Sequence, residues 1–246
     1  MLRRIKGYIK KFFLLCGLDI RRARPDRTYE WLREMNIRTV LDIGANKGQF
    51  VWQISKLLPD ARYYSFEPLK DCYEQLLKRM RHFSNFRAFP FALGDKSGKT
   101  QIHHNDFSPS SSLLSMEELH KEAFPYTKNV RIEEIEIRRL DEIIQELDIE
   151  DNLLIKIDVQ GFEDKVILGG EKLISRASIL IIETSFQPLY KGQALFGTIY
   201  DALSQLGFRY IGAEAPIRNP KDGSILSCDS IFCRAGDWWA KVSKDT

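Results

Sequence analysis

Five acidic side chains lie at or just after the ends of short apolar runs, where they could meet a common ligand. They are Asp42, Glu67, Asp95, Asp158 and Glu183. Predicted helices separate these runs, an alternation typical of a parallel sheet that binds its ligand at the carboxyl edge. The four histidines and four cysteines do not sit at metal-ligand spacing, so we expect no metal. Carboxylates without such a cluster suit a ligand rich in hydroxyls, amines or positive charge.

A glycine-bearing turn follows the first apolar run and resembles a nucleotide cradle. Gly44 and Gly48 remove side chains where a ligand must come close. Their spacing is G-x-x-x-G, not the G-x-G-x-x-G of dinucleotide binders. Asp42 would hold the amides of the turn or meet an amino group of the ligand. Asn46 offers a donor and an acceptor beside the glycines, or simply tolerates the left-handed conformation of a turn.

The next two acids could bind the nucleoside. Glu67 ends the second apolar run, 25 residues after Asp42. A carboxylate there can accept hydrogen bonds from both ribose hydroxyls, and a solvated strand-end acid is the alternative. Asp95 could accept from an exocyclic adenine amine, or it could stabilise the turn before Lys96.

The last two acids are candidates for contact with the second substrate. Asp158 could bind a reacting hydroxyl and take its proton, which typically contributes about 10²–10⁴ in rate. Positioning of the reactants can contribute more, roughly 7–11 kcal/mol, so the base would be secondary. Lys156 points to the same face of its strand as Asp158, and an ion pair between them is the structural alternative. Glu183 is an equal candidate for substrate contact.

The periodicity predicts an α/β domain with a mostly parallel sheet and helices on both faces. The predicted strands cover 38–43, 62–67, 86–93, 100–104, 130–138, 153–158, 178–183, 208–212 and 230–234. The predicted helices cover 28–36, 50–58, 71–81, 140–147, 163–168 and 196–206. Residues 100–104 are expected to pair back on the strand that precedes them. Residues 105–129 are the least regular, as expected for either a lid over the site or a plain surface loop.

Composition restricts the partners and the compartment. The chain has 246 residues and a net charge of +3, too small to argue for nucleic acid. Residues 1–27 hold an excess of seven positive charges and form a basic extension to a domain at 28–246. Scattered cysteines without C-x-x-C favour reduced thiols in a cytoplasmic protein. No stretch approaches the roughly 18 apolar residues of a membrane span.

The basic extension has two interpretations. Apolar residues at near-helical spacing in 1–18 predict an amphipathic helix. Such a helix could lie on the anionic inner surface of a membrane. It could also pack on the main domain, or on a second copy in a homo-oligomer. Because an apolar stripe alone does not distinguish a membrane-surface helix from a helix packed on protein, we favour packing on protein.

The sequence resembles the FkbM family of S-adenosylmethionine-dependent methyltransferases. The matching segments are 41–50 (LDIGANKGQF), 66–68 (FEP), 92–95 (ALGD), 111–114 (SSLL), 155–163 (IKIDVQGFE), 181–186 (IIETSF) and 189–190 (LY). The segment at 155–163 is the most specific, and the match spans about residues 38–234.

The resemblance implies a class I methyltransferase fold, with a seven-stranded sheet whose last strand is antiparallel. It implies S-adenosylmethionine bound by Asp42, Gly44, Asn46 and Gly48, with Glu67 on the ribose and Asp95 near the adenine. Members of the family are expected to methylate hydroxyl oxygens of sugars in bacterial glycans or of small natural products. Asp158 and Glu183 would then face the acceptor.

Two other functions are compatible with parts of this sequence. A nicotinamide-dependent oxidoreductase could use a similar sheet, but the glycine spacing disfavours it and no Tyr-x-x-x-Lys pair stands beside a candidate site. A non-catalytic protein could use the basic extension at a membrane surface. The strand-end acids and the resemblance favour the O-methyltransferase.

Overall fold

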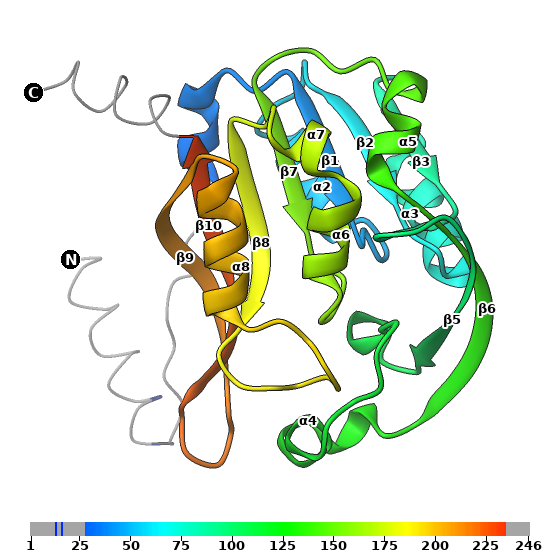
Figure 1. Cartoon of the computed structure of the whole chain (residues 1–246), viewed down its shortest axis with the longest axis vertical. Helices are drawn as coiled ribbons and strands as arrows, with labels where there is room; N and C mark the ends of the chain where they lie inside the picture. The colour runs from blue at the N-terminus through cyan, green and yellow to red at the C-terminus, as the bar shows by residue number, and fades with distance from the viewer. Residues whose placement is uncertain (1–12, 14–15, 17–27, 235–246) are drawn as a thin grey trace, which may run out of the picture. The chain divides into compact units, whose positions relative to one another are not determined.

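The computed structural model describes Phe13, Cys16 and residues 28–234, and its centre is a seven-stranded sheet (Figure 1). The strand order is β3-β2-β1-β7-β8-β10-β9. The bounds are β1 Thr39–Ile43, β2 Arg62–Phe66, β3 Phe86–Phe89, β7 Leu153–Ile157, β8 Ile179–Ser185, β9 Phe208–Arg218 and β10 Ile225–Arg234. β10 is antiparallel to both of its neighbours, and the other pairs are parallel. This is the sheet that the family resemblance implies, and the predicted fold class is confirmed.

Helices cover both faces of the sheet, with α6 and α8 in front of it and α2 and α3 behind it in Figure 1. Their bounds are η1 Glu30–Met35, α2 Gln49–Ser55, α3 Lys70–Met80, α5 Leu140–Ile143, η4 Ile144–Glu146, α6 Glu163–Gly169, α7 Glu171–Ile174 and α8 Phe196–Gln205. The large apolar cluster joins one face of the sheet to α5–α8. In it, Leu41, Ile155 and Leu180 of the strands pack with Val166 and Leu203 of the helices.

The central strands are apolar because both of their faces are buried. β1 and β7 are buried at all of their positions, as expected for parallel strands between two helical layers. Asp42 and Lys156 are the charged exceptions, and they are register partners across β1 and β7. Two buried ionisable groups side by side in a core sheet indicate a functional position, because burying each charge is costly.

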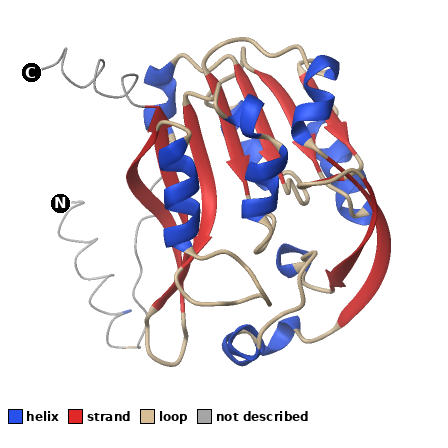
Figure 2. Cartoon of the chain, viewed as in Figure 1, coloured by secondary structure: helices blue, strands red, loops and turns tan. Residues whose placement is uncertain are grey.

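A second, three-stranded sheet lies beside the first, with the order β4-β6-β5 (Figure 2). Its strands are β4 Ala92–Leu93, β5 Gly98–Asn105 and β6 Val130–Arg138. The single strand predicted over 86–93 is therefore wrong. It divides at Pro90, which has no N–H to donate to a ladder, and its second half joins the other sheet.

The partner predicted for residues 100–104 is also wrong. β5 pairs antiparallel with β6, and β4 pairs parallel with β6. The sequence between β5 and β6 forms short helices: η2 Ser108–Ser110, α4 Glu118–Ala123 and η3 Pro125–Thr127. Two smaller differences concern α7, which the sequence does not predict, and β9, which continues beyond the predicted 208–212 to Arg218.

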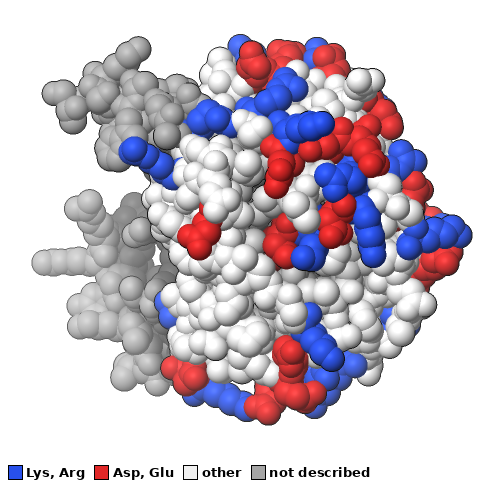
Figure 3. Space-filling model, viewed as in Figure 1, with Lys and Arg blue, Asp and Glu red and all other residues white. Residues whose placement is uncertain are grey.

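The amphipathic helix predicted for 1–18 lies outside the described residues, apart from Phe13 and Cys16. Within the described part of the chain, none of the helices has the length and apolar character needed to cross a bilayer. On the face drawn in Figure 3, basic and acidic side chains are interspersed and do not form a single basic surface.

Candidate active site

A cavity of about 550 Å³ lies at the carboxyl ends of the central strands. Its walls come from the ends of β1, β2, β7 and β8 and from the segment between β5 and β6. Six of the eight predicted site residues line it: Asp42, Gly44, Asn46, Glu67, Asp158 and Glu183. The volume is in the range of small-molecule pockets. Strand-end acids that are far apart in the sequence thus share one space.

The turn after β1 needs glycine at Gly44 for two reasons. Its φ is +82°, and a Cβ there would lie 1.9 Å from the carbonyl oxygen of Asp158. Asn46 follows with a φ of 47°, the left-handed conformation that asparagine tolerates. The β1 turn and the β7 end are therefore packed main chain against main chain.

Glu67, which follows β2, is hydrogen-bonded to this turn. Its Oε2 accepts a hydrogen bond from the Asn46 amide at 2.8 Å, and its Oε1 accepts one from the Leu69 amide at 2.8 Å. The side chain is 5% exposed, and this burial raises its pKa to about 7 although the two amides oppose the shift. Each carboxylate oxygen has a second lone pair, so Glu67 can still accept two further donors.

Asp42 is 2% exposed, and its Oδ2 has no hydrogen-bond partner among the described residues. Burial raises its pKa to about 7, which the nearby Lys156 ammonium partly offsets. A buried carboxylate oxygen without a partner costs free energy, so it calls for an explanation. Because Asp42 lines the cavity, a donor group on a ligand would provide the missing bond.

Gln160 joins the two acids that were predicted to meet the acceptor. Its amide nitrogen donates to Asp158 Oδ1 at 2.7 Å and to Glu183 Oε2 at 2.6 Å. Its amide oxygen accepts from the Tyr190 hydroxyl at 2.8 Å. Gln160 lies inside the most specific matching segment, but the sequence alone does not indicate this role. Its role depends on side chains that come together only in the fold.

Lys156 forms ion pairs with two acids at this position. Its ammonium is 3.1 Å from Asp158 Oδ2 and 3.1 Å from Asp229 Oδ1. The ion pair considered from the sequence is thus present, and Asp229 of β10 is an additional member. Asp158 lines the cavity as well, so the pairing does not remove it from the site.

The surroundings shift the pKa values of the two acids in opposite directions. Burial raises the pKa of Asp158, but the Lys156 ammonium and the Gln160 amide outweigh it, and the net pKa is below the usual value. Burial, followed by the negative charge of Asp158, holds the pKa of Glu183 well above its usual value. The two carboxyl groups thus differ in the direction of their pKa shifts, as in sites that assign different roles to two neighbouring acids.

Glu163 supports the turn that carries Gln160. Its carboxylate accepts from the Val159 amide at 3.0 Å and from the Gly161 amide at 3.0 Å. Gln160 itself has a φ of 56°, in the left-handed region that glycine favours. Glu163 does not line the cavity. Its role is to hold the turn in the conformation that aims Gln160 at the two acids.

Gly48 and Asp95 are not among the lining residues. Gly48 has a φ of +76°, and a Cβ there would lie 2.6 Å from Leu76 of α3, so it serves the packing of the turn. Asp95 lies beyond the short β4, where its carbonyl oxygen accepts a hydrogen bond from Arg139. Both residues of β4, Ala92 and Leu93, line the cavity, but the chain has left its wall by Asp95.

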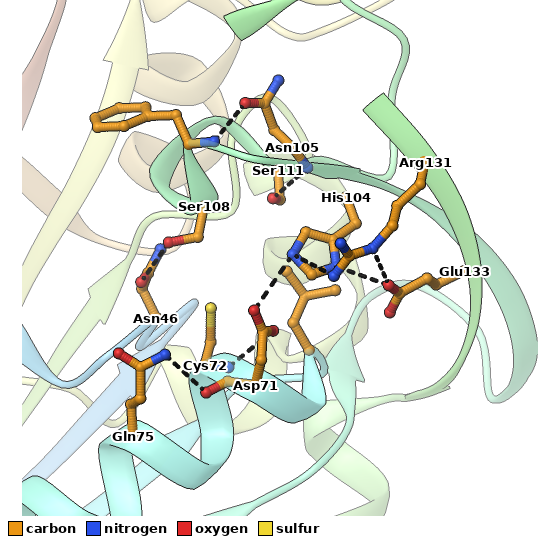
Figure 4. Close-up of polar contacts among 12 residues, drawn as sticks. Asn46, Asp71, Cys72, Gln75, His104, Asn105, Ser108, Ser111, Arg131 and Glu133 are labelled. Atoms are coloured by element: carbon orange, nitrogen blue, oxygen red, sulfur yellow. Dashed lines mark hydrogen bonds and ion pairs between the residues drawn. The ribbon is translucent and has the colours of Figure 1, made fainter. Parts of the chain in front are cut away.

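The segment at 105–129 covers the cavity. The Ser108 hydroxyl donates to Asn46 Oδ1 at 3.1 Å, as Figure 4 shows, and thereby joins the segment to the glycine turn. The Ser112 hydroxyl donates to the Gln160 carbonyl at 2.6 Å and joins it to the β7 turn. Of the two interpretations left open by the sequence, these contacts favour a cover over the site.

The sheet order and the cavity at its carboxyl edge define a class I methyltransferase fold. A solved structure, methyltransferase FkbM from Methylobacillus flagellatus, aligns with a TM-score of 0.51 and 17% identity, over 80% of this chain and 44% of that chain. At this identity the likeness concerns the fold alone.

A sequence model of the methyltransferase FkbM domain matches residues 42–210, and the chain belongs to the FkbM methyltransferase family. The 2-O-methyltransferase NoeI of Sinorhizobium fredii is 29% identical over 74% of this chain and 79% of that protein. The methyltransferase sdnD of Sordaria araneosa is 26% identical over 54% of this chain and 60% of that protein. The family predicted from the sequence is confirmed, and neither the oxidoreductase nor the non-catalytic alternative is favoured.

Proposed function

We propose that this protein transfers the methyl group of S-adenosylmethionine to a hydroxyl oxygen of a sugar, a glycan or a small natural product. The observation that carries the proposal is the shared cavity, which brings Asp42 and Glu67 together with the Asp158–Gln160–Glu183 group. The family supports methyl transfer, and the relative NoeI is named a 2-O-methyltransferase.

The residues on the β1–β2 side fit the methyl donor. Gly44 lines the cavity with main chain alone, and the Glu67 carboxylate has lone pairs for two ribose hydroxyls. The unpartnered Oδ2 of Asp42 would accept from the amino group of the methionine part. Asn46 would sit between these groups. Asp95 lies outside the cavity and is not included in the proposal.

The residues on the β7–β8 side fit the acceptor. When bound, S-adenosylmethionine supplies a sulfonium-activated methyl group, whose transfer to a hydroxyl leaves a neutral thioether and releases one proton. A hydroxyl oxygen becomes strongly acidic as it gains a third substituent, so even the low-pKa carboxylate of Asp158 suffices to take that proton. Glu183 would contact another oxygen of the acceptor, and Gln160 would keep both acids in place.

Calorimetry tests the donor half of the proposal. Titration of the full chain with S-adenosylmethionine and with S-adenosylhomocysteine should give one binding site for each. No heat from either ligand, with protein shown to be folded by circular dichroism, would falsify the proposal. Titration with NADH, followed by its fluorescence, serves as the comparison. Binding of NADH in place of the sulfur ligands would revive the oxidoreductase.

A further inference from the structure

His120 of α4 is a buried histidine that the proposed chemistry has not used. Its side chain is 4% exposed and lines the cavity. Neither ring nitrogen has a hydrogen-bond partner among the described residues. Burial lowers its pKa to about 4, so the imidazole is neutral at pH 7 and carries one donor and one acceptor.

The position of His120 is fixed by aromatic rings rather than by hydrogen bonds. Its ring packs edge-to-face against Phe124 at 5.4 Å and against Tyr190 at 5.1 Å between centroids. The Tyr190 hydroxyl bonds Gln160, which holds Asp158 and Glu183. The Tyr190 ring therefore connects the imidazole of His120 to the Asp158–Gln160–Glu183 group, which is proposed to bind the acceptor hydroxyl.

Two nitrogens without partners are unusual, because a buried polar group left unsatisfied costs free energy that the fold normally avoids. An apolar ring of the same shape would pack between Phe124 and Tyr190 without that cost. Since the imidazole borders the cavity, either a ligand that fits against this wall or a buried water can supply the partner that both nitrogens lack.

The wall around His120 is aromatic and partly exposed. Phe107 is 44% exposed and Tyr126 is 61% exposed, and both line the cavity. Their rings meet edge-to-face at 5.1 Å. Large aromatic rings at the mouth of a cavity favour a ligand with one apolar face. The carboxyl and amide groups deeper in the cavity require hydroxyls on the same ligand.

A pyranose ring combines these two properties, because its C–H groups form an apolar face and its hydroxyls lie around the edge. We propose that the α4 side of the cavity is the acceptor subsite for a pyranoside, in which His120 hydrogen-bonds a hydroxyl of the sugar and Phe107 and Tyr126 pack on its apolar face. This inference rests on the proposed function and narrows its acceptor to a sugar ring.

The test uses the full chain saturated with S-adenosylhomocysteine, with saturation checked by calorimetry. The probes are methyl glycosides of glucose, mannose, galactose and rhamnose, and saturation-transfer NMR measures their binding. His120→Phe keeps the ring and removes both nitrogens, and His120→Gln keeps a donor and an acceptor. The matched control is His82→Phe, the same change at an exposed histidine outside the cavity.

At least one glycoside should bind the wild type. His120→Phe should weaken that binding about tenfold, the usual effect of losing one hydrogen bond. His120→Gln should recover part of it, and His82→Phe should match the wild type. In the wild type loaded with ¹⁵N-histidine, addition of the glycoside should shift the ring nitrogens of His120, a readout that needs no stable variant.

Two results overturn the inference. One is that no glycoside of the panel binds the wild type while S-adenosylhomocysteine does. The other is equal binding to the wild type and His120→Phe without any ¹⁵N shift, which would make His120 a packing residue satisfied by a buried water only. Failure of S-adenosylhomocysteine to bind is a separate result, and it refutes the proposed function as well.

Discussion

Replacement of Glu67 by alanine tests the donor site in a way that separates binding from folding. In the free protein, the carboxylate accepts one backbone N–H on each oxygen. Glu67→Ala loses those two bonds in both the free and the bound states, so their loss appears in stability. The two proposed ribose bonds would exist only in the complex, so their loss should appear in affinity. At about 1–3 kcal/mol in total, affinity should fall roughly 5- to 150-fold.

Glu163→Ala is the matched control for this experiment. Glu163 is also a buried carboxylate that accepts from two backbone amides, but it does not line the cavity. Both variants should lower the thermal midpoint. Only Glu67→Ala should weaken the binding of S-adenosylhomocysteine, as measured by calorimetry. If both variants lose stability and both keep the wild-type affinity, the assignment of Glu67 to the ribose is refuted.

Three further predictions follow from the same geometry. Ribose hydroxyls donate more strongly to the ionised form of Glu67, whose pKa burial raises to about 7. Affinity for S-adenosylhomocysteine should therefore rise up to about tenfold per pH unit from about pH 6 and level off above about pH 8. Calorimetry across pH checks this, and a flat profile contradicts it. Gln160→Leu should lower kcat/KM at least about tenfold with whichever methyl glycoside the wild type turns over, because Asp158 and Glu183 lose their shared donor. Calorimetry should show unchanged S-adenosylhomocysteine affinity, and a joint loss would argue against a role confined to the acceptor. Gly44→Ala should lower the free energy of unfolding in urea by about 3 kcal/mol or more, since its Cβ would collide with the Asp158 carbonyl. Gly192→Ala, with a φ of +74° and open space around it, should cost about 1–2 kcal/mol, and equal losses would contradict the packing argument.

The sequence predicts the sheet and most of its rim because these follow from local patterns. Strands that are buried on both faces have continuous apolar sequences, so an acidic residue at the end of such a run is easy to recognise. Asp42, Glu67, Asp158 and Glu183 were all found by this signal, and all four line one cavity. A local pattern therefore located residues whose association is long-range.

The same reasoning placed Asp95 on the rim because 86–93 was read as one strand. Pro90 interrupts the ladder, and β4 pairs with β6 in the second sheet. The sequence contains the proline but does not say which sheet receives the residues after it. That choice depends on β6, which arrives more than 30 residues later.

Gln160 and His120 show a different limit. Gln160 acts through four partners from separate elements, and nothing in its own surroundings in the sequence signals that convergence. His120 lies in a segment without a clear periodicity, where neither a helix nor burial was predicted. The surroundings of both residues form only when segments that are distant in the sequence come together in the fold.

A crystal structure with S-adenosylhomocysteine bound tests the central claim most directly. The account predicts that both ribose hydroxyls lie within hydrogen-bond distance of the Glu67 carboxylate, and that the sulfur faces the side of the cavity where Gln160 joins Asp158 and Glu183. A nucleoside bound elsewhere, or a sulfur turned away from those acids, would contradict it.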